Sequence, residues 1–264
     1  FPMNDKFEIY ASMNTAKTVG GDFYDFYYID REHVLIEIAD VSGKGIPAAM
    51  FMMRAKTLLK SLIESGQSLE LAFSEANRML CEGNDAQMFV TAWIGVVNLT
   101  NGHVEYVNAG HNPPIIRNEQ GEYVYLKSRP GFVLGGYDSY KYTMQSFDLK
   151  PGEKIYLYTD GVTEAMNKDR VLFGEERLLK IINENKNHGP NTICRTIKEE
   201  ITKHVNGYEQ SDDITMLCFA LNGRDGIDVM VVDAKIENMQ NITQYIDKLL
   251  DEHGCQEKIK FDIN

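Results

Sequence analysis

The sequence of 264 residues has few cysteines, and none of them stands in a metal-binding pattern. The four are Cys81, Cys194, Cys218 and Cys255, with no CxxC spacing among them. The common zinc-site patterns are therefore excluded. Cysteines this dispersed indicate four reduced thiols, as expected for a cytosolic protein.

Basic residues are also in deficit, since 27 Lys and Arg stand against 39 Asp and Glu, for a formal net charge of −12. A general nucleic-acid binder carries a basic face, so no nucleic-acid partner is expected. No run of about 18 apolar residues occurs, so no membrane span is expected. The chain opens at Phe1 without a signal peptide or an initial Met. We therefore expect a cytoplasmic piece of a longer protein, which leaves room for membrane or sensor segments outside it.

The residues that are present predict short strands and blocks of helices. Aromatic and β-branched residues favour strands over residues 7–12, 23–29, 33–40, 89–99, 103–108, 123–127, 142–148, 154–159 and 214–220. Helices are predicted over residues 46–64, 69–80, 175–184 and 192–205, with Pro47 in the first turn of one and Ser68 as the cap of another. Strands and helices gathered in blocks indicate the α+β class rather than alternating βαβ units.

A domain boundary is predicted near residue 222, where Asn222-Gly223 and Asp225-Gly226 favour turns. Beyond it we expect a strand at 228–232, an amphipathic helix that ends near Gly254, and a last strand. About forty residues are few for an independent core. Residues 1–222 are therefore expected to form one domain, and residues 223–264 the truncated start of a second.

Four loops place aspartates beside glycines or strand ends. They read VGGDFYD, ADVSGKG, YTDG and SDDIT, and they hold Asp22, Asp40, Asp160 and the pair Asp212 and Asp213. Strand ends fix carboxylates on a rigid frame, and glycine lets a metal or a phosphate come close to the backbone. A single loop of this kind is most often an ordinary turn, but four in one chain are a much stronger signal.

Carboxylates without histidine or cysteine nearby suit hard cations such as Mg²⁺ and Mn²⁺. Several carboxylates in one cleft would repel one another, and divalent cations would neutralise them. A two-metal centre can deprotonate a water and clamp an oxyanion during in-line attack on phosphorus. The aspartate loops therefore predict metal-dependent phosphoryl chemistry.

Five motifs in this order, GGDFYDF, ADVSGKGIPAAM, NAGHNPP, YTDGVTEA and SDDIT, resemble the stage II sporulation protein E / RsbU branch of the metal-dependent protein phosphatases. The resemblance covers about residues 5–220. It implies a four-layer α-β-β-α sandwich of two antiparallel sheets flanked by helices, with two Mn²⁺ or Mg²⁺ ions at one end. It also implies a serine/threonine phosphoprotein phosphatase that works through a metal-activated water and forms no phosphoenzyme.

The resemblance also implies the metal ligands, which are Asp22, Asp40, the Val41 carbonyl, Asp160, Asp212 and, ranked below Asp212, Asp213. Asp40 would bridge the two metals. Asp22 and Val41 would complete one site, and Asp160 and Asp212 the other. The aspartates among them are the expected catalytic residues.

The sequence gives a weaker signal for the residue that binds the substrate phosphate than for the metal ligands. Eukaryotic relatives use an Arg shortly before the first acidic motif, and residues 14–18 contain none here. Lys17 and Lys44 are the candidates, although a lysine is a point charge without a bidentate fork. For Lys17 an ordinary surface position is equally expected, and Lys44 is expected to neutralise the acid cluster or cap the next helix. This departure favours a docked protein substrate over a small ester.

Three further features have competing interpretations. Asp25 should face away from Asp22 if both lie on a strand, so a structural role is expected for it. His111 is expected to fix its loop, with a general-acid role as the alternative. The resemblance makes the helices over residues 47–65 and 69–80 candidate regulatory switch elements.

The segment DVMVVDAKIENMQNITQYIDKLLDEHG resembles the start of an anti-sigma-factor kinase domain of the histidine-kinase ATPase superfamily. Its ATP–Mg motif is absent, so no kinase activity is expected. The implied substrate is a phosphorylated anti-sigma-factor antagonist or a similar bacterial signalling protein. An upstream sensor module or partner protein is also implied, and a homodimer is allowed.

Two other functions stay open. A non-catalytic docking module of the same fold would bind a partner without turning over any phosphoprotein. The GGD at residues 20–22 suggests a nucleotide cyclase. The FYD that follows departs from a GGDEF signature, and the expected ferredoxin-like order of elements is lacking, which disfavours that class.

Overall fold

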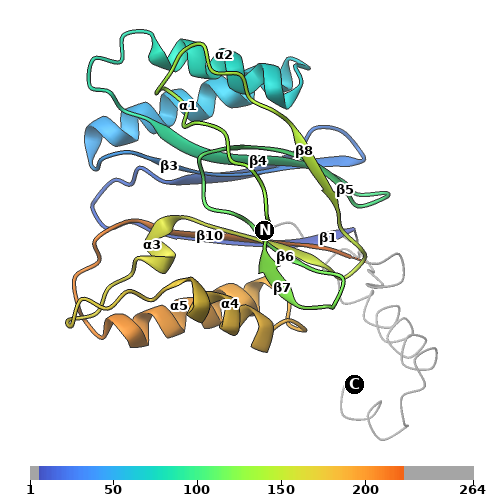
Figure 1. Ribbon diagram of the computed structural model, residues 1–264, viewed down its shortest axis with the longest axis vertical. Coiled ribbons are helices and arrows are strands. Elements are labelled where there is room, and N and C mark those ends of the chain that lie inside the picture. The colour runs from blue at the N-terminus through green and yellow to red at the C-terminus, as the bar shows by residue number, and fades with distance from the viewer. Residues whose placement is uncertain (1–5, 223–264) are drawn as a thin grey trace, which may run out of the picture. The chain divides into compact units, whose positions relative to one another are not determined.

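The computed structural model describes residues 6–222, which form two five-stranded sheets with helices on their outer faces (Figure 1). The strand order is β1-β10-β9-β6-β7 in one sheet and β2-β3-β4-β5-β8 in the other. All the strand pairs within the two sheets are antiparallel. The predicted α+β class and the four-layer sandwich are therefore confirmed.

The first sheet pairs the first described strand with the last. Its strands are β1 (Phe7–Asn14), β10 (Ile214–Leu221), β9 (Lys154–Tyr158), β6 (Ile115–Arg117) and β7 (Tyr123–Tyr125). Along β10, Ile214 lies opposite Asn14 of β1, and Met216 lies opposite Tyr158 of β9. The loop that follows β9 and the loop that precedes β10 therefore meet at one end of this sheet.

The second sheet brings together two other loops in the same way. Its strands are β2 (Phe23–Tyr28), β3 (His33–Val41), β4 (Val90–Asn98), β5 (His103–Ala109) and β8 (Gln145–Asp148). Phe23 lies opposite Ala39, so the residue before β2 is a neighbour of the end of β3. The hairpin predicted between β4 and β5 is confirmed by their antiparallel pairing.

The helices cover the outer face of each sheet (Figure 1). Helices α1 (Ile46–Glu64) and α2 (Leu69–Cys81) pack on the second sheet, and α4 (Glu175–Glu184) and α5 (Pro190–Val205) pack on the first. A single turn, α3 (Asp160–Thr163), follows β9 directly. Pro47 lies in the first turn of α1, as predicted.

Ser68 stands at the N-cap of α2, as predicted, although its side chain makes no capping hydrogen bond. Other predicted boundaries were wrong. Helix α5 begins at Pro190 and not at Thr192, because proline is well suited to a first helical position. The strand expected from Tyr142 forms only from Gln145. Strand β6 and helix α3 were not predicted.

The space between the sheets is filled by large apolar side chains, among them Ile36, Trp93 and Phe219. Trp93 is fully buried, so the expectation that it is a core residue is confirmed. Its indole lies along its own strand, where a Cβ atom on Gly95 would stand 2.3 Å from the ring. Glycine at position 95 is therefore needed for this packing.

Three cysteines, Cys81, Cys194 and Cys218, are free thiols, as expected; Cys255 lies outside the described residues. No helix within residues 6–222 combines the length and the apolar character that crossing a bilayer requires. The strands and helix expected after residue 222, and the kinase-like resemblance of that segment, also lie outside the described residues.

One carboxylate is buried beneath α1. Glu37 of β3 is 1% exposed, and neither of its side-chain oxygens has a hydrogen-bond partner. The pKa of Glu37 is raised from 4.5 to about 8, chiefly by burial and then by the charge of Asp25, while Lys56 and Lys60 of α1 oppose the shift. The folded protein therefore holds Glu37 protonated at pH values where the unfolded chain would ionise it.

This burial predicts a pH-dependent stability. The contribution of Glu37 to the free energy of unfolding is fully present below about pH 4.5 and is lost as the pH rises towards about 8. We expect the stability of the native protein, relative to Glu37→Gln, to fall by on the order of a few kcal/mol across this window. Urea unfolding of both proteins from pH 4.5 to 8.5 measures the difference, and parallel pH profiles would show that the assignment is wrong.

Candidate metal centre

Four aspartates from the two sheets approach one another at one end of the sandwich. Asp22 immediately precedes β2 and Asp40 lies near the end of β3, while Asp160 begins α3 and Asp212 lies just before β10. The charges of the other three aspartates all act on Asp40. The structure thus brings together four side chains predicted from the sequence, which are spread over nearly two hundred positions of the chain.

The close approach of these carboxylates is electrostatically unfavourable. Burial raises the pKa of Asp40, and the neighbouring charges of Asp22 and Asp160 raise it further. Burial likewise raises the pKa of Asp22, which shares a side-chain hydrogen bond with Asp40. The pKa of Asp160 is raised by burial first, then by Glu164 and Asp212. Full ionisation of the cluster therefore requires compensating positive charge.

Part of that charge comes from Lys44. Its ammonium lies 2.9 Å from a carboxylate oxygen of Asp212 and also donates a hydrogen bond to the Ser211 carbonyl. Of its expected roles, neutralising the acid cluster is confirmed by this ion pair, and capping the next helix is not, because α1 has no side-chain capping hydrogen bond. The phosphate contact stays a prediction. Lys17 is exposed and makes no hydrogen bond or ion pair with the other described residues.

Asp213 uses its carboxylate to hold a loop. One oxygen accepts a hydrogen bond from the Ala16 amide at 2.8 Å. The other accepts bonds from the amides of Gly21 at 2.8 Å and Asp22 at 3.4 Å. These bonds join the loop before β10 to the loop that carries Asp22. In the structure Asp213 is an anchor for that loop, and its predicted role as a ligand is not tested by these bonds.

Thr159, at the end of β9, was missed by the sequence analysis. Its buried hydroxyl donates to a carboxylate oxygen of Asp22 at 2.8 Å and accepts a hydrogen bond from the Thr215 amide at 3.1 Å. It therefore connects β9 and β10 with a side chain from the other sheet. The only signal in the sequence is its position directly before Asp160 in YTDG.

Two glycines let the backbone segments of the centre approach closely. A Cβ atom on Gly21 would lie 3.1 Å from the Val41 carbonyl oxygen, so the predicted backbone ligand borders the Asp22 loop. A Cβ atom on Gly161 would lie only 1.9 Å from the Asp213 carbonyl oxygen. The absence of a side chain at Gly161 lets α3 lie close against the loop before β10, and Asp160 thereby comes near Asp212.

His111 fixes its loop, as expected. Its Nε2 bonds to the Tyr158 carbonyl at 3.1 Å and its Nδ1 to the Thr91 hydroxyl at 2.8 Å. The Asn108 side chain binds both the amide and the carbonyl of His111. Burial lowers the pKa of His111 to about 4, so the ring is neutral near pH 7 and is poorly suited to be a general acid.

Asp25 has the structural role expected of it. It forms an ion pair at 3.1 Å with Lys56 of α1. Since this pair lies on the helix-covered face of the second sheet, Asp25 takes no part in the cluster around Asp40.

The donor set fits hard divalent cations. Among residues 6–222, no three His, Cys, Asp or Glu side chains already stand as a group that could hold a metal ion. The aspartates nevertheless offer only oxygen donors, which Mg²⁺ and Mn²⁺ prefer. Bound cations would also remove the repulsion that raises the pKa values of Asp22, Asp40 and Asp160. Asp22, Asp40, Asp160, Asp212 and the Val41 carbonyl are the residues that would hold them.

Comparison with known proteins shows which family the chain is similar to. The sequence profile described as "Stage II sporulation protein E (SpoIIE)" matches residues 30–222. The chain is 32% identical over 216 residues to "Phosphoserine phosphatase RsbU" of Bacillus subtilis, a match that covers 82% of this chain and 64% of that protein. The chain spans less than two thirds of the length of the curated relatives that head the comparison.

Two solved structures share the fold. The RsbU and RsbW domains of Rv1364c from Mycobacterium tuberculosis superpose with a TM-score of 0.74 at 23% identity, covering 98% of this chain and 72% of that one. RsbX in complex with magnesium superposes with a TM-score of 0.64 at 17% identity, covering 84% of this chain and 98% of that one. At these identities the likeness establishes the fold alone.

The contact at Gly161 generates a prediction about the centre. Gly161→Ala must push α3 away from the loop before β10, because its methyl group would overlap the Asp213 carbonyl. We expect this change to cost on the order of 1–3 kcal/mol of stability and to weaken Mn²⁺ binding. Urea unfolding and calorimetric titration with Mn²⁺ measure the two effects.

Gly189→Ala is the matched control. Gly189 has an ordinary φ of −70°, and its added Cβ would meet only the flexible end of the Glu8 side chain. We expect this variant to bind Mn²⁺ as the native protein does. If Gly161→Ala also behaved like the native protein, the backbone contact would not be what positions Asp160 and Asp212.

Proposed function

The chain belongs to the stage II sporulation protein E family, and we propose on this premise that it is a Mn²⁺- or Mg²⁺-dependent serine/threonine phosphoprotein phosphatase of bacterial signalling. The observation that carries the proposal is the convergence of Asp22, Asp40, Asp160 and Asp212 from the ends of both sheets. The relative called phosphoserine phosphatase RsbU supports the same activity.

The reaction is the transfer of a phosphoryl group from a serine or threonine side chain to water. Asp22, Asp40, Asp160, Asp212 and the Val41 carbonyl would hold two divalent cations. The cations would supply the positive charge that activates the water and stabilises the transferring phosphoryl group. The aspartates lie on strand ends and a short helix, so their positions are set before substrate arrives.

The surrounding residues of the chain keep these ligands in place. The Thr159 hydroxyl orients the Asp22 carboxylate, and Asp213 holds the loop on which Asp22 lies. Lys44 pairs with Asp212. If Asp212 held a cation instead, the Lys44 ammonium would be free to contact the substrate phosphate. Lys17 is the second candidate for phosphate binding, since it is exposed and unpaired among the described residues.

We propose a phosphorylated anti-sigma-factor antagonist, or a similar signalling protein, as the substrate. An upstream sensor module or partner protein would control the activity, and residues 223–264 would begin a histidine-kinase-like ATPase domain. The match to a relative named phosphoserine phosphatase RsbU supports phosphoserine as the group that is hydrolysed. The lack of an arginine in residues 14–18 supports a docked protein substrate over a small ester.

Asp40→Asn tests the proposed function. Asp40 would serve both cations, so its loss should lower the rate of Mn²⁺-dependent phosphate release from a phosphoserine protein by at least about 100-fold. Excess EDTA should abolish the activity of the native protein. Release of inorganic phosphate measures both effects.

Asp148→Asn is the matched control, because Asp148 is an exposed aspartate of β8 that pairs with His103 at the surface. We expect it to keep native activity. Undiminished activity in Asp40→Asn, or in EDTA, would refute the metal-dependent mechanism. A folded native protein that binds its partner but shows no turnover at saturating Mn²⁺ would favour the non-catalytic docking module.

A further inference from the structure

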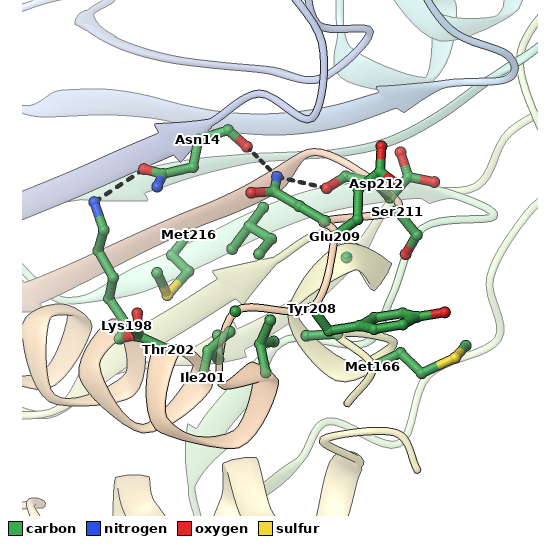
Figure 2. Close-up of a pocket in the computed structure, with 16 residues that line it drawn as sticks. Asn14, Met166, Lys198, Ile201, Thr202, Tyr208, Glu209, Ser211, Asp212 and Met216 are labelled. Atoms are coloured by element: carbon green, nitrogen blue, oxygen red, sulfur yellow. Dashed lines mark hydrogen bonds between the residues drawn. The ribbon is translucent and has the colours of Figure 1, made fainter. Parts of the chain in front are cut away.

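A cavity of about 240 Å³ opens beside the candidate metal centre, between α3, α5, β10 and the loop of residues 207–212 (Figure 2). Asp212 and Gly161 line it and also belong to the centre. An apolar cavity of about 150 Å³ holds benzene, whereas pockets for drug-sized ligands begin near about 300 Å³. The cavity therefore fits an amino-acid side chain and is too small for a nucleotide.

The wall of this cavity is largely apolar. Helix α5 and strand β10 contribute Ile201, Val205, Ile214 and Met216, and the segment after α3 adds Met166. Figure 2 shows Met216 and Ile201 between the Lys198 side of the cavity and the Asp212 side. An aliphatic side chain would remove its apolar surface from water against this wall, which favours binding.

A lysine stands at the side away from Asp212. Lys198 of α5 donates a hydrogen bond to the Asn14 side-chain oxygen at 3.0 Å, which Figure 2 draws as a dashed line. It forms no ion pair with any of the residues that the structure describes. The negative groups that line the cavity are Glu209 and Asp212, and Asp212 is already paired with Lys44. Lys198 is therefore a cation that a ligand carboxylate can reach.

We propose that this cavity is the specificity pocket for the phosphorylated segment of the protein substrate. It takes an aliphatic side chain that flanks the phosphoserine, while Lys198 pairs with an acidic residue of the same segment. The inference rests on the proposed function, because the phosphoserine must lie at the Asp212 end, next to the centre. Contacts with the flanking residues add binding energy to the contact that a single lysine makes with the phosphate.

A phosphoserine peptide library with randomised flanking positions tests the proposal. Phosphate release by the native protein with Mn²⁺ is measured on the library and on p-nitrophenyl phosphate, which has no flanking residues. We expect the native protein to prefer peptides that carry one aliphatic and one acidic residue near the phosphoserine. The reference ratio is the kcat/KM of the native protein for the best peptide divided by its kcat/KM for p-nitrophenyl phosphate.

Two variants address the two parts of the pocket. Thr202→Phe places a large ring in the cavity from an exposed position on α5, and it should lower the reference ratio at least about tenfold. Lys198→Glu should replace the preference for an acidic flanking residue with a preference for a basic one. The matched controls are Thr192→Phe and Lys203→Glu, which are exposed on the same helix outside the cavity and should leave the ratio unchanged.

The possible results separate this inference from the function on which it rests. Hydrolysis of all substrates without a flanking preference, or a reference ratio that Thr202→Phe leaves at the native value, would overturn the pocket and leave the phosphatase intact. An unaltered charge preference in Lys198→Glu would remove the role of Lys198. No metal-dependent phosphate release from any substrate would overturn the proposed function and the pocket together.

Discussion

Carboxylates repel one another, and a fold can hold several of them together only where something compensates that repulsion. In this protein Asp22 and Asp40 come from one sheet and Asp160 and Asp212 from the other, so the packing of the sheets itself forces the groups together. Burial and mutual repulsion both raise the pKa values of Asp40 and Asp160. The end of the sandwich is therefore a site that divalent cations would stabilise, and much of the local architecture serves to keep it assembled.

The supporting residues fix the loops and side chains of the centre relative to one another. Asp213 binds three amides of the Asp22 loop, and Thr159 links that loop to β9 and β10. Gly161 permits a backbone contact that any side chain would prevent. Adjacent acidic residues thus have opposite uses, since Asp212 faces the cluster and Asp213 is satisfied by hydrogen bonds. One short motif therefore contributes one aspartate to the acidic cluster and another to the structure of the neighbouring loop.

The parts of the fold that could be predicted are those with a strong local pattern. Helices α1 and α4 were predicted at their observed bounds, because the apolar pattern and the residues at the helix ends indicate the same limits. Strand β6 has only three residues, and α3 begins with an Asp-Gly pair that locally resembles a turn. The aspartates were found because they lie in motifs. The bonds of Asp213 to residues 192 and 197 positions away, and the cavity lined by residues from Asn14 to Met216, depend on tertiary structure that no local pattern contains.

The central claim is that the aspartate cluster exists to hold two divalent cations. Electron paramagnetic resonance of Mn²⁺ titrated into the native protein counts bound ions directly, because free and protein-bound Mn²⁺ give different signals. We expect two bound ions per chain, and Asp40→Asn should lose at least one of them. A native protein that binds no Mn²⁺ at millimolar concentration, while remaining folded, would contradict it.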